Sequence, residues 1–313
     1  MAVAALRSEG GVWCYVGGNC IKLRDNFESK KEGLEKQLTD ILGETWKIDI
    51  NPNAIWAYAE DDSYGKDNLG ACLHSYIADT IWNLKYFLEK HGDLGKTELN
   101  TVATAHTLTL ALDTTGSVSY ASCDIHDGTL RLLFQEGNLG TNISQTTKIE
   151  TLEAALCAAN PDAAALSYSA RLNIAQVWDA KLPDLQKKIA AQLANDKIVL
   201  DPNFAAVYAT LKAAPGVAKE RPDWEKSLGY IMHQYFSGLL HTLEYQKFEK
   251  DDMLQEGFAE AVEKGEIRFR VVEKLGRTYN ESVVEDGVFW LQTKPDMWGT
   301  NCGDVASDVV NLL

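Results

Sequence analysis

Apolar residues recur at helical spacing in four segments of the chain. Within 34–42 and 185–193 they fall every three or four residues, which predicts one amphipathic helix near the start of each half. The longer segments 68–90 and 224–250 carry aromatic and aliphatic residues around much of the helical circumference. A helix with so little polar surface is largely buried. The pattern therefore predicts an amphipathic helix followed by a long buried helix in each half.

Strands are predicted where apolar and polar residues alternate. Residues 107–112 and 266–271 alternate with a period of two, so each strand is expected to bury one face and expose the other. Asp127-Gly128 and Asp286-Gly287 lie at the same place in the two halves, inside later apolar stretches. Asp-Gly between such stretches is a strong hairpin signal, so a hairpin is predicted at each position.

An Asx-Pro-Asn triplet separates two short apolar runs in each half, at 51–53 and at 201–203. Asx and Pro favour turns, so the flanking runs 46–50 and 55–58 are predicted to be strands joined by a tight corner. The corresponding run 204–209 in the second half is equally compatible with a helix.

The two halves resemble each other in sequence. Residues 69–86 and 228–245 lie 159 positions apart and share six identities in 18 positions, where unrelated sequences would share about one. The same shift extends to Gly-Thr-Asn at 140–142 and 299–301. Upstream the shift is 150 residues, and the difference falls in the polar stretch around 213–216, where an insertion is tolerated. The chain is therefore predicted to be an internal duplication.

Together these elements predict an α+β fold made of two tandem units, each in the order α-β-β-α-β-β-β. Residues 1–150 are expected to form the first unit, and 151–313 the second, which ends in a short C-terminal tail. In each unit an antiparallel sheet is expected to be backed by the long helix. The units are predicted to be related by a pseudo-twofold axis, packing either sheet to sheet or through paired edge strands.

Composition narrows the classes of partner. The 313 residues are 45% hydrophobic and 24% charged, which is ample material for packed cores. The net charge of −15 disfavours a nucleic-acid or anionic-membrane surface, because both need a dense positive field. The first ten residues lack the features of a signal peptide, and no segment approaches the roughly 18 apolar residues of a membrane span. A cytoplasmic protein is therefore expected, with neither nucleic acid nor membrane as a partner.

Recognised motifs for catalysis or cofactor binding do not occur in the sequence. The six cysteines are scattered without a CxxC pair, so no metal site is expected. Gly95-Lys96-Thr97 resembles the end of a phosphate-binding loop, but the upstream glycine is Gly92 and the context is helical, which argues against that function. The polar cluster 124–127 is interpreted as a solvated hairpin tip, and Cys14 as a buried structural cysteine rather than an exposed thiol. No cofactor is predicted, and whether any catalysis occurs stays open.

The duplication nominates four binding candidates, His74 and Tyr76 in the first half and His233 and Tyr235 in the second. Residues two apart on a helix point about 200° away from each other, so neither pair converges on one ligand without help from elsewhere. As a functional site they would meet across the pseudo-twofold axis, with histidine as acid, base or polar anchor. The structural interpretation is favoured, in which each His makes a buried polar contact to the sheet and each Tyr fills the core.

Eight tryptophans are many for this length, and exposed ones would mark an interface or an apolar ligand pocket. Together with the lack of catalytic motifs, they favour a non-catalytic intracellular interaction protein, a scaffold or a subunit whose sheet faces or edges meet a protein partner. The alternative is a small-molecule-binding enzyme or carrier with a pocket between sheet and helix, where His74 or His233 is the polar group. The expected partner is accordingly a protein or an apolar small molecule.

Overall fold

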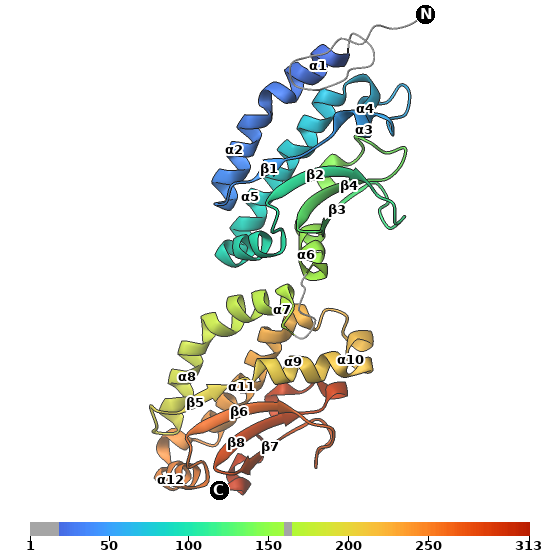
Figure 1. The fold of residues 1–313 in the computed structure, drawn as a ribbon. Coiled ribbons are helices and arrows are strands. Elements are labelled where there is room, and N and C mark those ends of the chain that lie inside the picture. The colour runs from blue at the N-terminus through green and yellow to red at the C-terminus, as the bar shows by residue number, and fades with distance from the viewer. Residues whose placement is uncertain (1–18, 160–164) are drawn as a thin grey trace, which may run out of the picture. The chain divides into compact units, whose positions relative to one another are not determined.

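The computed structural model describes residues 19–159 and 165–313, and it divides the chain into two units, Met1–Pro161 and Asp162–Leu313 (Figure 1). Each unit contains helices and one four-stranded sheet, so the predicted α+β class is confirmed. The first unit extends past residue 150, because its last helix begins at Ile149. Cys14 lies outside the described residues.

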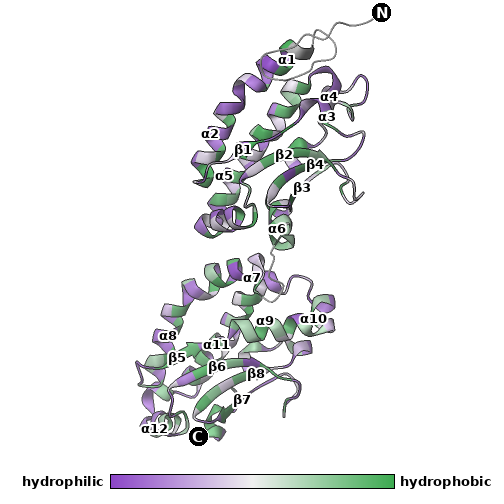
Figure 2. Ribbon diagram, viewed as in Figure 1, coloured by the Kyte–Doolittle hydropathy of each residue, from purple (hydrophilic) through white to green (hydrophobic). Residues whose placement is uncertain are grey.

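The first unit contains one long helix, with shorter helices and the strands before and after it in the chain. In chain order they are α1 (Asn19–Asn26), α2 (Lys31–Leu42), β1 (Lys47–Ile48), α3 (Pro52–Trp56), α4 (Tyr64–Asp67), the long helix α5 (Leu69–Val102), β2 (Thr107–Leu112), β3 (Ala121–His126), β4 (Thr129–Phe134) and α6 (Ile149–Ala158). Figure 2 shows that polar residues predominate along α2, whereas much of β4 is apolar.

The second unit follows a similar order of elements. It contains α7 (Tyr168–Asn173), a π-helical turn (Ile174–Asp179), α8 (Ala180–Gln192), β5 (Val199–Asp201), α9 (Phe204–Ala213), α10 (Pro215–Glu220), the long helix α11 (Leu228–Tyr245), α12 (Asp252–Ala261), β6 (Glu266–Val271), β7 (Asn280–Glu285) and β8 (Val288–Thr293). The C-terminal tail ends in a short 3-10 helix, Val309–Leu312.

Both sheets are mixed, not antiparallel as predicted. In the first, the order is β1-β2-β4-β3, where β1, β2 and β4 run parallel and only β3 is antiparallel to its neighbour β4. The second has the same arrangement, β5-β6-β8-β7. The prediction failed because alternation shows which residues share a face but not the direction of the neighbouring strand. The long helix that connects β1 to β2 provides the crossover that a parallel pair requires.

The two Asp-Gly hairpins are confirmed. Asp127 and Gly128 have φ angles of 48° and 71°, and they join β3 to β4. Asp286 and Gly287 have φ angles of 50° and 70°, and they join β7 to β8. Two successive positive φ angles define the hairpin turn that matches the twist of the strands, and Asp-Gly accepts them readily.

The second predicted strand of the first unit is a helix, and the run 204–209, which the sequence left open between strand and helix, is a helix as well. The side chain of Asn51 accepts hydrogen bonds from the amides of Asn53 and Ala54, and Pro52 occupies the first helical position of α3. Helix α9 likewise begins directly after Asn203. Asn and Pro favour a helix N-terminus as strongly as they favour a turn, and the apolar runs that follow are too short to distinguish a strand from a helix.

Strand register shows which positions of the two units correspond. Lys47 pairs with Thr107, and Val199 pairs with Glu266. Thr107 and Glu266 correspond to each other by the 159-residue shift. Their partners Lys47 and Val199 therefore correspond as well, although they are 152 positions apart. The upstream shift of 150 is therefore wrong by two in this segment, and Asn51 corresponds to Asn203. The shared strand order and register are what a duplicated unit would give, and the duplication itself stays a prediction.

The long helices α5 and α11 carry much of the buried surface of their units. In its first turn each helix packs a glycine against preceding backbone: Gly70 against Lys22 and Leu23 of α1, and Gly229 against the Asn173–Ile174 backbone. None of the helices in the described part of the chain is both long enough and apolar enough to cross a bilayer.

Candidate functional site

Tyr76 and Tyr235 are fully buried, and each anchors the Gly-Thr-Asn turn of its own unit. The Tyr76 hydroxyl accepts a hydrogen bond from the amide of Gly140 at 3.1 Å, and the Tyr235 hydroxyl accepts one from Gly299 at 2.9 Å. Burial raises the pKa of both phenols well above its usual range, so both stay protonated. The recurrence of Tyr and of Gly-Thr-Asn in the two halves therefore has a structural explanation.

His74 and His233 are half-buried, and the contacts described for them have no residue in common with those of the tyrosines. Burial lowers the pKa of both imidazoles, with a further contribution from Lys30 at His74 and from Lys181 at His233. These lysines are 151 positions apart, which is the spacing of the helices that precede β1 and β5. Each histidine therefore lies near a lysine at a corresponding position of its unit. The histidine and the tyrosine of a unit do not share a site.

We expect these histidines to make stability fall at mildly acidic pH. An imidazole whose pKa is lowered on folding binds fewer protons in the folded state than in the unfolded state. The free energy of unfolding should therefore fall as pH drops below about 6.5 and level off below the folded-state pKa. Urea unfolding at pH 7.5 and pH 5 should show a smaller loss for the double variant His74→Gln, His233→Gln than for the wild type. Equal losses would contradict the assignment.

Other polar clusters named from the sequence have local partners. Arg131 binds the carboxylate of Asp124 through two nitrogens, and His126 lies 3.1 Å from Asp127 at the exposed hairpin tip. Gly95-Lys96-Thr97 lies within α5. The described residues contain no group of three His, Cys, Asp or Glu side chains arranged to hold a metal ion.

Among the tryptophans that the structure describes, Trp82 is conspicuously exposed. The Trp82 side chain on α5 is 66% exposed and stacks on Tyr86 with 6.1 Å between ring centroids, whereas Trp46, Trp178 and Trp298 are buried. The corresponding position to Tyr86 in α11 is Tyr245, which is 76% exposed. Exposed stacked aromatics of this kind are typical of protein interfaces.

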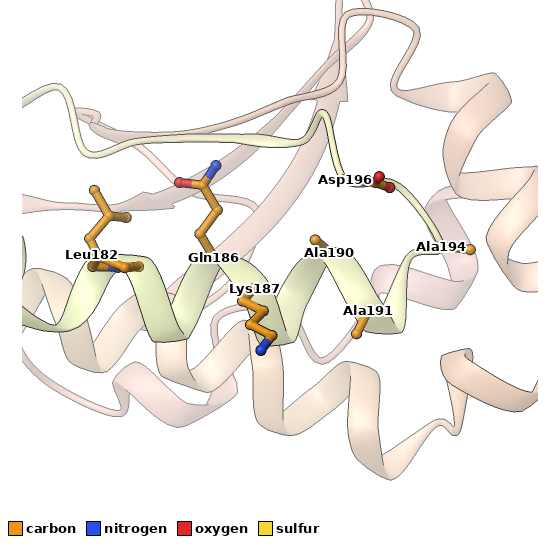
Figure 3. A pocket seen from close by; sticks show the side chains of 8 residues that line it. Leu182, Gln186, Lys187, Ala190, Ala191, Ala194 and Asp196 are labelled. Carbon is orange, nitrogen blue, oxygen red and sulfur yellow. The ribbon is translucent and has the colours of Figure 1, made fainter.

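The second unit has a groove of about 770 Å³ along α8. Figure 3 shows Leu182, Gln186 and Ala190 projecting from α8 toward the chain segment that follows Asp196. These residues are spaced by four and so form one row on the helix. The groove is completed by small or flexible side chains: Pro183, Lys187, Ala191 and Ala194. Its lining is therefore largely apolar.

Gln186, which lines the groove, also lies next to the edge strand β5, because it contacts Ile198, the residue before that strand. The amide of Val199 donates to the carbonyl of Gly265 next to β6 at 2.9 Å. Because successive residues of a strand direct their main-chain groups to opposite sides, Leu200 directs its N–H and C=O away from β6. No group in the described part of the chain accepts a hydrogen bond from the Leu200 amide. Gln186 instead donates its side-chain amide to the carbonyl of Ile198 at 3.0 Å.

The first unit closes the corresponding edge. Ile48 occupies the position that Leu200 occupies in β5, and its amide donates to a carboxylate oxygen of Glu35 at 2.9 Å. Glu35 on α2 corresponds to Gln186 on α8. A carboxylate accepts the outward amide, whereas the glutamine turns its donor to the neighbouring carbonyl. The difference between Glu35 and Gln186 thus leaves the outward amide hydrogen-bonded in β1 and, among the residues that the structure describes, without an acceptor in β5.

Neither a protein-family model, a curated protein nor a solved structure matches the chain. Sequence reasoning named the recurring His and Tyr but missed Gln186 and the open edge of β5. The signal that could have indicated the open edge was the difference between Glu35 and Gln186 in otherwise similar amphipathic helices. It can be interpreted only when the strand beside each helix is known.

Proposed function

We propose that the chain is a non-catalytic interaction protein whose second unit binds an extended segment of a partner protein by strand addition to β5. The observation that carries the proposal is the uncapped Leu200 amide beside the groove on α8. Exposed strand edges pair readily with other chains, and proteins normally cover them. The first unit follows that rule through Glu35.

The groove suits an extended segment better than a helix. An added strand continues the sheet, with its main chain bonded to Leu200 and its alternate side chains directed toward α8. Because a net hydrogen bond contributes only about 1 kcal/mol, main-chain bonds alone give weak binding. Burial of a small apolar side chain against Leu182 and Ala190 supplies the rest. Pro202 limits the length of the pairing, because it has no N–H.

The exposed Trp82–Tyr86 pair supports the same class of function independently, because exposed aromatic side chains are common at protein interfaces. By contrast, neither His74 nor His233 lines the groove on α8. The groove therefore does not support the small-molecule alternative built on those histidines.

The variant Gln186→Glu tests the proposal. It recreates the carboxylate that caps Ile48 in the first unit, so we expect it to accept the Leu200 amide and close the edge. Peptides selected from a displayed random library with the wild-type chain should bind the variant at least about tenfold more weakly, a loss of roughly 1.4 kcal/mol. They should also shift the Leu200 amide resonance of the wild type.

Hydrogen exchange provides the matched control without a ligand. In the wild type, Leu200 should exchange faster than Ile48, and Gln186→Glu should slow Leu200 while Glu35→Gln speeds Ile48. Peptides that bind Gln186→Glu as tightly as the wild type, or that leave Leu200 unchanged, would exclude strand addition at β5.

A further inference from the structure

A second cavity, of about 580 Å³, lies in the first unit where α2 ends. Its polar lining comes from one face of the last turns of α5, with Asp93, Lys96 and Thr97, together with Glu44 and His106. Spacings of three and four place these α5 side chains on the same side of the helix. The site is independent of the groove on α8, and the strand-addition proposal makes no use of it.

The floor of this cavity is held by hydrogen bonds. Trp46 donates its indole N–H to the side-chain oxygen of Asn100 at 2.9 Å, and Asn100 donates its amide to the carbonyl of Leu42 at 2.9 Å. The His106 ring packs against Trp46 with 5.8 Å between centroids, and its Nε2 lies 3.3 Å from the carbonyl oxygen of Asn100. Asn100 and His106 are therefore held in place at the floor of the cavity.

His106 has a left-handed backbone, with φ of 44°. The corresponding residue of the second unit is Gly265, with φ of 61°. Glycine adopts this conformation without strain and histidine does not, so the first unit retains an unfavourable residue here. Strained residues that persist often serve a binding or catalytic role.

Other residues of the cavity also differ from the residues at the corresponding positions of the second unit. By the same 159-residue shift, Asn100 corresponds to Ala259 and Lys96 to Gln255. The side-chain amide of Gln255 donates a hydrogen bond to the carbonyl of Gln192 at 3.0 Å. The second unit thus lacks both the hydrogen-bonded floor and the free cation.

Lys96 is a half-buried residue that lines the cavity. The Lys96 Nζ lies beside Gly43, and a Cβ added to Gly43 would be 2.7 Å from this nitrogen. Gly43 has a φ of 78° and directly follows α2. Within residues 19–159 and 165–313, Lys96 forms no ion pair with a carboxylate. Asp93 and Glu44 also line the cavity and are exposed. The cavity lining therefore combines one cation with two carboxylates.

We propose that this cavity binds a small zwitterion of the α-amino acid class. The ligand carboxylate binds the ammonium of Lys96, with the hydroxyl of Thr97 in reach of the same group. The ligand ammonium binds the carboxylates of Asp93 and Glu44, and the ligand side chain lies toward His106. Opposite charges on both partners give orientation as well as attraction. A volume of about 580 Å³ is within the range of small-molecule sites.

Calorimetry and amide chemical shifts with the full chain test this proposal. The probes are the twenty common L-amino acids, with acetate and methylammonium as single-charge controls at equal concentration. At least one amino acid should bind saturably and shift amides of residues 93–106, and each control should bind at least about tenfold more weakly. Lys96→Met should weaken the amino acid at least about tenfold, whereas Gln255→Met, the corresponding change in the second unit, should leave it unchanged.

His106→Gly provides a variant that keeps the fold, because glycine occupies this position in the second unit. We expect it to raise the urea midpoint while weakening amino acid binding severalfold. Absence of any amino acid binding, equal binding of acetate, or unchanged binding to Lys96→Met would each overturn the proposal.

Discussion

Gly229→Ala is expected to lower the free energy of unfolding by about 1–3 kcal/mol, because the added methyl group overpacks a helix crossing. A Cβ at Gly229 would lie 2.7 Å from the carbonyl oxygen of Asn173 and 2.8 Å from the Cα of Ile174. Both atoms belong to backbone, so they move only if α11 separates from the preceding helical segment. Urea unfolding followed by circular dichroism measures the effect. Gly70→Ala should behave alike in the first unit, where the nearest atom is the carbonyl oxygen of Lys22 at 2.6 Å.

Gly33→Ala is the matched control. Gly33 lies within α2, and apart from the adjacent backbone of that helix no atom lies within 4 Å of the position of its Cβ. Alanine there should stabilise the chain by roughly 0.5–1 kcal/mol, because it restricts the unfolded state and favours the helix. The sign of the effect thus separates the two kinds of glycine. Stabilisation by Gly229→Ala and Gly33→Ala alike would show that α11 does not approach the neighbouring backbone closely.

Local signals in the sequence were sufficient for several elements. The Asp-Gly hairpins and the alternating strands 107–112 and 266–271 could be predicted because their determinants lie within a few residues. The helices at 52–56 and 204–213 were missed or left open, because Asn-Pro serves equally as a turn and as a helix start. The parallel pairing of β2 with β4 was missed because strand direction depends on which distant segments meet.

The candidate sites depend still more on distant contacts. Recurrence in sequence found Tyr76 and Tyr235, which are structural anchors. The groove and the cavity instead lie at residues that differ between the halves, Gln186 against Glu35 and His106 against Gly265. These differences are visible in the sequence. Their meaning required knowledge of which strand amide and which floor residues lie beside them.

Tyr235→Phe is the second change with a large expected effect, a loss of about 1–3 kcal/mol in the free energy of unfolding. The substitution retains the ring, which packs against Phe269 at 4.7 Å and Trp298 at 5.7 Å between centroids. It removes the acceptor of the Gly299 amide and the donor to the side-chain oxygen of Asn280. Unsatisfied polar groups in this part of the core are the source of the loss. Tyr76→Phe should cost somewhat less, because the Tyr76 hydroxyl has one such contact, to Gly140.

Tyr245→Phe is the control for removal of a tyrosine hydroxyl, because Tyr245 is 76% exposed on the same helix. It should change the free energy of unfolding by less than about 0.5 kcal/mol. If Tyr235→Phe proved as mild as Tyr245→Phe, the Gly-Thr-Asn turn would be held by other contacts and its recurrence would need another cause. If it proves costly, the residues that the two halves share are those that hold each unit together. The residues that differ between the halves are then the places where we propose that the two units bind different ligands.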